Sequence, residues 1–406
     1  MADIERSDSS ARSIATVFIA ALKLGLTSFG GPVAHLAYFH DEYVRRRGWI
    51  EEQSYTDLVA LCQMLPGPAS SQVGMAIGMH RAGIAGGIAS WLGFTLPSAA
   101  LITAFALLLH GTGGIGAGLI HGLLIVAVAV VGNAVISMAR NQAAGPLRAV
   151  IAACSLAAML LVPSPLTQIG VILFGAAAGA LFMRSASTPP PTEFHVPIRR
   201  GTAIISLLLF VLLLGLLPLA ASLSGVRSVA MIDSFYRSGA LVFGGGHVVL
   251  PLLEQLVVGP GWMDQTRFLA GYAAAQAVPG PLFSFSAYLG ASMNGAPSGV
   301  VGAVIALLSI YLPSFLLLIG ALPLWAAIRR HQSMQAVVSG IGPAVVGLLA
   351  AALYTPVFTA AIRAPADLAL AGVAFALLVG VKAPAWLVVI TGAACGVLMH
   401  ALGLTR

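Results

Sequence analysis

Two copies of one helix-breaking motif constrain the fold more than any other feature of this sequence. Pro66-Gly67-Pro68 returns as Pro279-Gly280-Pro281, 213 residues later. Each proline fixes φ and lacks an N–H, while the glycine tolerates the turn between them, so we expect one helix to end before each motif and another to begin after it. The second helix begins with unpaired N–H groups at the positive end of its dipole, which favours a bound anion.

Other motifs recur at nearly the same offset. Phe29-Gly30-Gly31-Pro32 corresponds to Phe243-Gly244-Gly245-Gly246, and Leu96-Pro97-Ser98 corresponds to Leu312-Pro313-Ser314, with offsets of 214 and 216 residues. We interpret the chain as a tandem duplication. The Phe-Gly-Gly stretch predicts a second helix break in each copy.

The composition places these broken helices in a membrane. Hydrophobic residues make up 59% of the chain and charged residues 8%, against roughly 25% charged residues in soluble proteins. The net charge of +7 is spread over short loops, which indicates positive-inside sorting and no nucleic-acid partner. Cys62, Cys154 and Cys395 lack metal-ligand spacing and are expected to be packing residues. The sequence therefore predicts an all-α polytopic protein of the lipid bilayer, with no cleaved signal peptide.

Loop charges predict the orientation of the two copies. The turns that carry Arg81, Arg140 and Arg148 alternate with uncharged turns, so they are expected to be cytoplasmic. The predicted order is a first transporter repeat (1–183), a cytoplasmic Pro-rich linker (184–200), an extra transmembrane helix (201–228) and a second repeat (229–406). The extra helix makes the second repeat inverted relative to the first. We expect about 10–13 membrane segments, since each broken region is either two crossings or a re-entrant hairpin.

Two cations hold equivalent places in the two copies. Lys23 and Arg237 each stand six residues before the phenylalanine of the first break. Ionisable groups at membrane depth are costly and usually line a pathway or hold a counter-ion, so we interpret both as contacts of an anionic substrate. The alternative for each is snorkelling to the interface, or a structural ion pair with Asp57 or Asp233.

Inverted broken helices bring their ends together near the bilayer midplane, where transporters bind substrate. We therefore predict a site for a small dianion at the four breaks and within two turns of them. The residues assigned to this site are Lys23, Phe29, Gly30, Gly31, Gln63, Pro66, Gly67, Pro68, Ser70, Ser71, Arg237, Phe243, Gly244, Gly245, Gln276, Pro279, Gly280, Pro281 and Ser284.

Several polar residues keep two interpretations. The amides of Gln63 and Gln276 can donate to an oxyanion or join neighbouring helices, and the serines can donate hydroxyls or cap helices. His35 and His247 are candidates for proton coupling, with a structural role as the alternative. Three polar residues occur only in the first copy, and the sequence does not distinguish a place on the transport pathway from a packing role for them: Asn133, Asn141 and Gln142.

On the Phe-Gly-Gly and Pro-Gly-Pro motifs and their copies, the chain resembles the chromate ion transporter family in its long, two-domain form, over nearly its whole length. The resemblance implies a multi-pass protein of the bacterial inner membrane that exports chromate, a tetrahedral dianion that mimics sulfate, and so confers chromate resistance. Gly246 stands where Pro32 predicts a proline, so the two first breaks need not share a conformation.

The leading hypothesis is a secondary transporter or antiporter, driven by the proton gradient or by anion exchange. A transporter or channel for sulfate or a related oxyanion is the alternative. A membrane-embedded enzyme has no support, because the sequence contains no His-Glu-x-x-His, no Gly-x-Ser-x-Gly and no paired aspartates within apolar spans. The sequence also contains no P-loop, so direct ATP drive is not expected. No cofactor or metal is expected, and a homodimer is carried as a candidate assembly.

Overall fold

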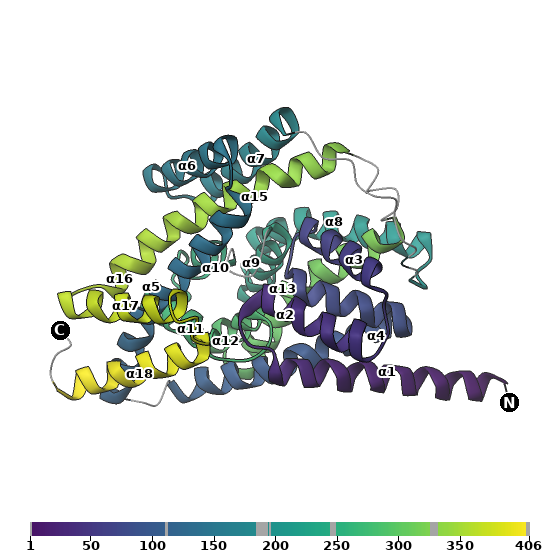
Figure 1. Ribbon diagram of the computed structural model, residues 1–406, viewed down its shortest axis with the longest axis horizontal. Helices are drawn as coiled ribbons and strands as arrows, with labels where there is room; N and C mark the ends of the chain where they lie inside the picture. Colours follow the sequence, from purple (N-terminus) through teal and green to yellow (C-terminus); the bar gives the residue numbers. More distant parts are fainter. Residues whose placement is uncertain are drawn as a thin grey trace.

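The computed structural model describes residues 2–109, 113–183, 194, 196–243, 249–324 and 332–402 of the chain. Helices make up almost all of this part, as the composition predicts (Figure 1). Most of the predicted linker 184–200 lies outside the described residues.

The first half of the chain (residues 1–183) forms helices whose ends match the predicted breaks. In order these are α1 (Ala2–Thr27), α2 (Gly31–Phe39), the π-helical turn η1 (His40–Arg46), α3 (Glu52–Met64), α4 (Ala69–Leu109), α5 (Gly113–Gln142), α6 (Pro146–Leu161) and α7 (Pro165–Phe182). The backbone of α4 leaves helical geometry at Ala82 and Gly83, so α4 is two helices joined at a kink.

The extra helix α8 (Arg200–Ser224) leads into the second half (residues 229–406). There follow α9 (Arg227–Leu241), α10 (Val249–Val257), α11 (Gln265–Ala275), η3 (Leu282–Ser284), α12 (Phe285–Ser292), α13 (Gly299–Ala321), η4 (Leu322–Leu324), α15 (Gln332–Ala352), η5 (Leu353–Phe358), α16 (Thr359–Ala361), α17 (Pro365–Val379) and α18 (Ala385–Ala401).

Five described helical stretches are long and apolar enough to cross a membrane: Ala69–Leu109, Gly116–Gln142, Arg200–Ser224, Gly299–Leu324 and Ser339–Ala361. Most of α8 is uncovered by protein, with leucine, isoleucine and valine side chains exposed along its length. Exposed apolar surface of this extent on a helix is favourable only against lipid. The chain is therefore a polytopic membrane protein, while the number of crossings stays a prediction.

The two halves interlock. In the first half α1 packs against α4, and in the second α9 packs against α13; α4 then contacts α12 and α13. The remaining helices pair across the two halves: α5 of the first half packs against α17 and α18 of the second, and α15 of the second half packs against α6 and α7 of the first (Figure 1). Each half therefore supplies one central helix, α5 or α15, and the two helices that cover the central helix of the other half.

Small residues allow these exchanged helices to approach closely. Gly122 of α5 faces the backbone of Gly392 on α18, and Gly175 of α7 faces the backbone of Gly340 on α15. A Cβ at any of these positions would collide with the opposite helix. Close contact through glycine is the usual basis of helix association in lipid, where no hydrophobic force drives helices together.

Candidate functional site

The Pro-Gly-Pro motifs interrupt the helices as predicted. In the first half α3 ends before Leu65, whose backbone is extended, and α4 begins at Ala69. In the second half α11 ends at Ala275 and a 3-10 turn follows Pro281. The breaks at the Phe-Gly-Gly stretches are also confirmed, because α1 ends at Thr27 and α9 at Leu241.

The four breaks are joined across the two halves by backbone hydrogen bonds. Gly67 donates its N–H to the carbonyl of Val242 at 2.7 Å, and Gly280 donates its N–H to the carbonyl of Ser28 at 2.9 Å. Val242 and Ser28 each stand directly before the phenylalanine of the other half's first break. The contacts are therefore reciprocal, and each Pro-Gly-Pro glycine is fixed by the opposite half.

Both motif glycines are required by their conformation and surroundings. Gly67 has φ of 118° and Gly280 has φ of 108°, in the region that L side chains rarely adopt. A Cβ on Gly67 would collide with Oγ of Ser314, and a Cβ on Gly280 would lie 2.9 Å from Oγ of Ser98. The Leu-Pro-Ser serine of each half therefore closes over the Pro-Gly-Pro turn of the other.

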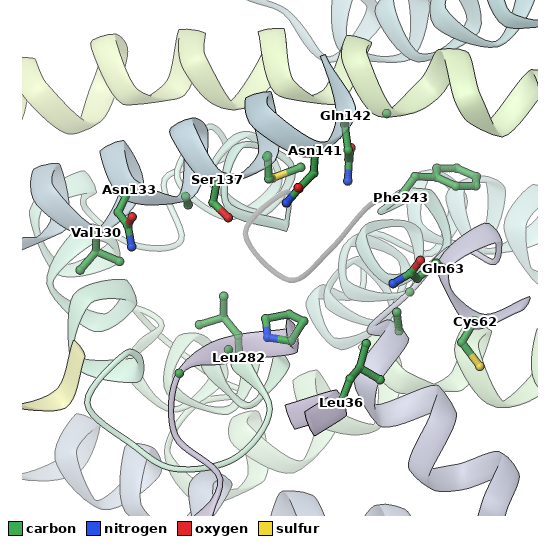
Figure 2. A pocket seen from close by; sticks show the side chains of 18 of the residues that line it. Leu36, Cys62, Gln63, Val130, Asn133, Ser137, Asn141, Gln142, Phe243 and Leu282 are labelled. Atoms are coloured by element: carbon green, nitrogen blue, oxygen red, sulfur yellow. The ribbon is translucent and has the colours of Figure 1, made fainter. Parts of the chain in front are cut away.

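A cavity of about 820 Å³ opens beside these crossed breaks, where the Pro-Gly-Pro motif of each half meets the Phe-Gly-Gly break of the other (Figure 2). Both halves line it, and its walls are mainly apolar or backbone. The polar side chains of the lining are amides, hydroxyls and one guanidinium: Gln63, Asn133, Ser137, Asn141, Gln142, Arg148, Gln276 and Ser339. Figure 2 shows Asn133, Ser137 and Asn141 projecting from α5 into the cavity, with Gln63 on the opposite side.

Arg148 is the one charged side chain among the described lining residues, and no described carboxylate lines the cavity. Arg148 makes no ion pair with another described residue. The cavity therefore offers hydrogen-bond donors and a positive charge, which is the chemistry that an oxyanion needs. No group of three His, Cys, Asp or Glu residues that could hold a metal ion occurs in the described part of the chain.

The structure places part of the predicted site on this cavity. The predicted residues that line it are Gly30, Gly31, Gln63, Gly67, Phe243, Gln276 and Gly280. Those that lie outside the lining are Lys23, Phe29, His35, Pro66, Pro68, Ser70, Ser71, Arg237, Pro279, Pro281 and Ser284. Gly244, Gly245 and His247 lie outside the described residues.

Both predicted cations are held in ion pairs. Arg237 donates to Asp233, one turn earlier on α9, with Nε 2.9 Å from Oδ1. Lys23 Nζ lies 2.7 Å from Oε2 of Glu42 in η1, a different acid from the predicted Asp57. In this conformation neither cation lines the cavity.

Glu42 is the centre of a larger charge cluster. Its side chain is buried and also accepts from Arg46 at 3.3 Å and from Arg47 at 2.8 Å. Burial opposes ionisation of this carboxyl, but the hydrogen bonds and positive charges of Lys23 and Arg47 outweigh it and hold the pKa of Glu42 below its usual value.

The predicted serines and His35 contact protein groups, one within its own turn and the others on different helices. Ser284 donates to the carbonyl of Pro281 at 2.8 Å, which fixes the turn after the second motif. The hydroxyl of Ser71 lies 3.4 Å from that of Tyr311. His35 is buried, lies edge-on to Phe94, and has Nδ1 3.3 Å from Oγ of Ser70.

Sequence reasoning left Asn133 and Asn141 open between pathway and packing, and it assigned no role to Ser137. Asn133, Ser137 and Asn141 recur every four residues, which places them on one face of a helix, and this spacing was visible in the sequence. Arg148 was counted only as a loop charge. The buried pair of His121 on α5 and Asp367 on α17, 2.9 Å apart, could not be found from sequence, because its members belong to different halves.

Comparisons with known proteins find one family in both halves of the chain. The family model described as "Chromate transporter" matches residues 15–180 and 229–397, one stretch in each half. The chain is 27% identical to the chromate transport protein of Pseudomonas aeruginosa over 82% of this chain and 79% of the relative. It is 25% identical to the chromate transport protein of Cupriavidus metallidurans over 92% and 90% of the two chains. No solved structure matches the chain.

Proposed function

Because this chain belongs to the chromate transporter family, we propose that it carries chromate through the cavity between its two halves. The direction we propose is export from the cytoplasm across the bacterial inner membrane, which gives chromate resistance. Relatives that cover most of the chain are named as chromate transport proteins, which supports this substrate.

The observation that carries the proposal is the cavity at the crossed breaks. Chromate is a dianion whose oxygens accept hydrogen bonds, and the described lining supplies amide, hydroxyl and guanidinium donors with no carboxylate to repel it. The helix breaks also free backbone groups close to the cavity, as in transporters that bind anions at interrupted helices.

We propose alternating access by movement of one half against the other. The reciprocal bonds of Gly67 to Val242 and of Gly280 to Ser28 support two equivalent halves around one site. The loop charges support an inverted relation between the halves. Energy from the proton gradient, or from exchange for a second anion, would drive the cycle.

Lys23 and Arg237 stay in the proposal as substrate contacts of another conformation. In the present one their carboxylate partners are Glu42 and Asp233. A dianion could replace either partner only if the cation reaches the cavity during the transport cycle.

Sulfate is the second candidate substrate. It shares the tetrahedral shape and charge of chromate, and the lining donors recognise oxygens without reference to the central atom. Relative affinity must therefore be measured.

The test is transport by the purified protein in liposomes. We expect uptake of radiolabelled chromate that shows counterflow and responds to an imposed pH gradient or to a trapped anion, with sulfate, molybdate and phosphate compared in parallel. Protein-free liposomes are the control for leakage. Absence of uptake of all four anions would refute the proposal, and uptake without counterflow would indicate a channel.

A further inference from the structure

One face of α5 carries a row of polar side chains that the helix does not need for its own stability. Asn133, Ser137 and Asn141 are spaced four residues apart, so they stand about 6 Å apart along one side of the helix. All three line the cavity. The helix that carries them is otherwise among the apolar stretches long enough to span a membrane.

These three side chains have no hydrogen-bond partner within the described part of the chain. None of them forms a side-chain hydrogen bond with another described residue, and Ser137 and Asn141 are exposed to the cavity. Polar groups in membrane helices normally pair with neighbouring helices or face a water-filled pathway. No described contact supports an interhelical role for them, and their place on the cavity lining favours the pathway interpretation.

The row is one-sided. At the offset of 216 residues given by the Leu-Pro-Ser motifs, the positions that correspond to the row are Leu349, Leu353 and Val357, all apolar. Leu349 and Val357 are completely buried. The two halves match at the breaks but differ here, so the second half supplies no equivalent row of polar side chains.

Arg148 follows this row in the chain and also lines the cavity. Three residues separate α5 from α6, and Arg148 is the third residue of α6. A cation in the first turn of a helix lies at the positive end of the dipole, where its own charge is disfavoured and a bound anion is favoured. Arg148 has no carboxylate partner in the described part of the chain to relieve this.

We propose that Asn133, Ser137 and Asn141 form an oxyanion track along α5, and that Arg148 draws the dianion onto it. The track presents amide and hydroxyl donors in succession, so a tetrahedral oxyanion exchanges one set of hydrogen bonds for the next along about 12 Å of helix. This inference rests on the proposed function and names the residues that would perform it.

The experiment measures chromate uptake kinetics of full-length variants in liposomes. Asn141→Asp places a negative charge on the track, and Arg148→Gln removes the positive one. Because a hydrogen bond to a charged group contributes enough free energy to change affinity about tenfold or more, we expect both to raise the chromate KM by at least that factor. Asn141→Gln keeps the donor and should restore most of the affinity.

Matched controls lie just off the cavity. Ala144→Asp introduces the same charge as Asn141→Asp in the exposed loop after α5, and Arg140→Gln removes an exposed cation that does not line the cavity. Both should keep the wild-type KM. If the controls raise KM as much as the track variants do, the effect comes from the overall charge of the protein and not from the track, and the proposal is overturned.

The outcomes separate the track from the proposed function. If the wild-type protein transports no oxyanion, the proposed function fails. If the wild type transports chromate and folded Asn141→Asp and Arg148→Gln keep its KM, the track fails while the function stands. Ser137→Ala and Asn133→Ala repeat the test with uncharged changes, should Asn141→Asp not fold; an unchanged KM in both would also overturn the track.

Discussion

Substitution of Gly67 by alanine tests the crossed arrangement of the breaks. Gly67 has φ of 118° and donates its N–H to the carbonyl of Val242 at 2.7 Å. The left-handed backbone costs an L residue about 1–2 kcal/mol. The new Cβ also collides with Oγ of Ser314 and lies 2.8 Å from Nε2 of Gln72, and overpacking of this kind costs about 1–3 kcal/mol. Together the change should destabilise the protein by about 2–5 kcal/mol.

The assay is thermal unfolding of the purified protein in detergent, combined with chromate uptake in liposomes. Gly170→Ala is the matched control, because Gly170 lies in α7 with no atom near its absent Cβ. Alanine there should be neutral or stabilise by about 0.5–1 kcal/mol, since it is the better helix former. Gly67→Ala combined with Ser314→Ala should recover the part of the loss due to Ser314 and leave the backbone part and the contact with Gln72.

Wild-type stability and uptake in Gly67→Ala would refute this reasoning. A double variant as unstable as Gly67→Ala alone would show that Ser314 does not close over the turn.

Three further outcomes are expected. Asp367→Ala leaves His121 without its partner and removes the acceptor of the N–H groups of Arg363 and Ala364 at 3.0 Å, so it should lower the unfolding free energy by about 3–5 kcal/mol in a chemical-denaturation series; an unchanged midpoint would contradict this. Because the pKa of Glu42 is lowered in the folded state, its ionised carboxyl stabilises the fold above pH 4.5, the ordinary pKa of this group, and this contribution is lost as pH falls through the lower folded pKa. The difference in unfolding free energy between wild type and Glu42→Gln should therefore shrink in acid. A difference independent of pH would argue against this role of Glu42. Arg237→Ala should abolish uptake while folded protein stays in the membrane, and normal uptake would remove Arg237 from the site.

The parts of the fold that depend on local chemistry could be predicted from sequence. Two prolines around a glycine end a helix wherever they occur, so the breaks at Gly67 and Gly280 follow from the motif alone. The pairing of helices could not be predicted, because the faces that α5 and α15 present to their partners are mostly apolar with small residues, and the one buried ion pair described between α5 and α17, His121 with Asp367, joins residues of different halves. Nothing in such a pattern indicates that α18 covers α5 while α7 covers α15.

Part of the site could be predicted because it lies beside the helix breaks that the sequence defines. Gln63 and Gln276 line the cavity because each lies beside a break that the sequence defines. Lys23 pairs with Glu42, an acid on a separate element that only the tertiary fold brings near. The partner of Arg237 was visible, since Asp233 precedes it by one helical turn.

The exchange of covering helices sets an order of events during synthesis. Helix α5 ends at Gln142, but α18, which packs against it, ends at Ala401. At roughly 5–20 residues per second, the ribosome needs on the order of ten to fifty seconds to make the intervening chain. Throughout that interval the glycine-lined face of α5 lacks the helix that packs against it in the folded protein, so α5 reaches its final packing only after α18 has been synthesised.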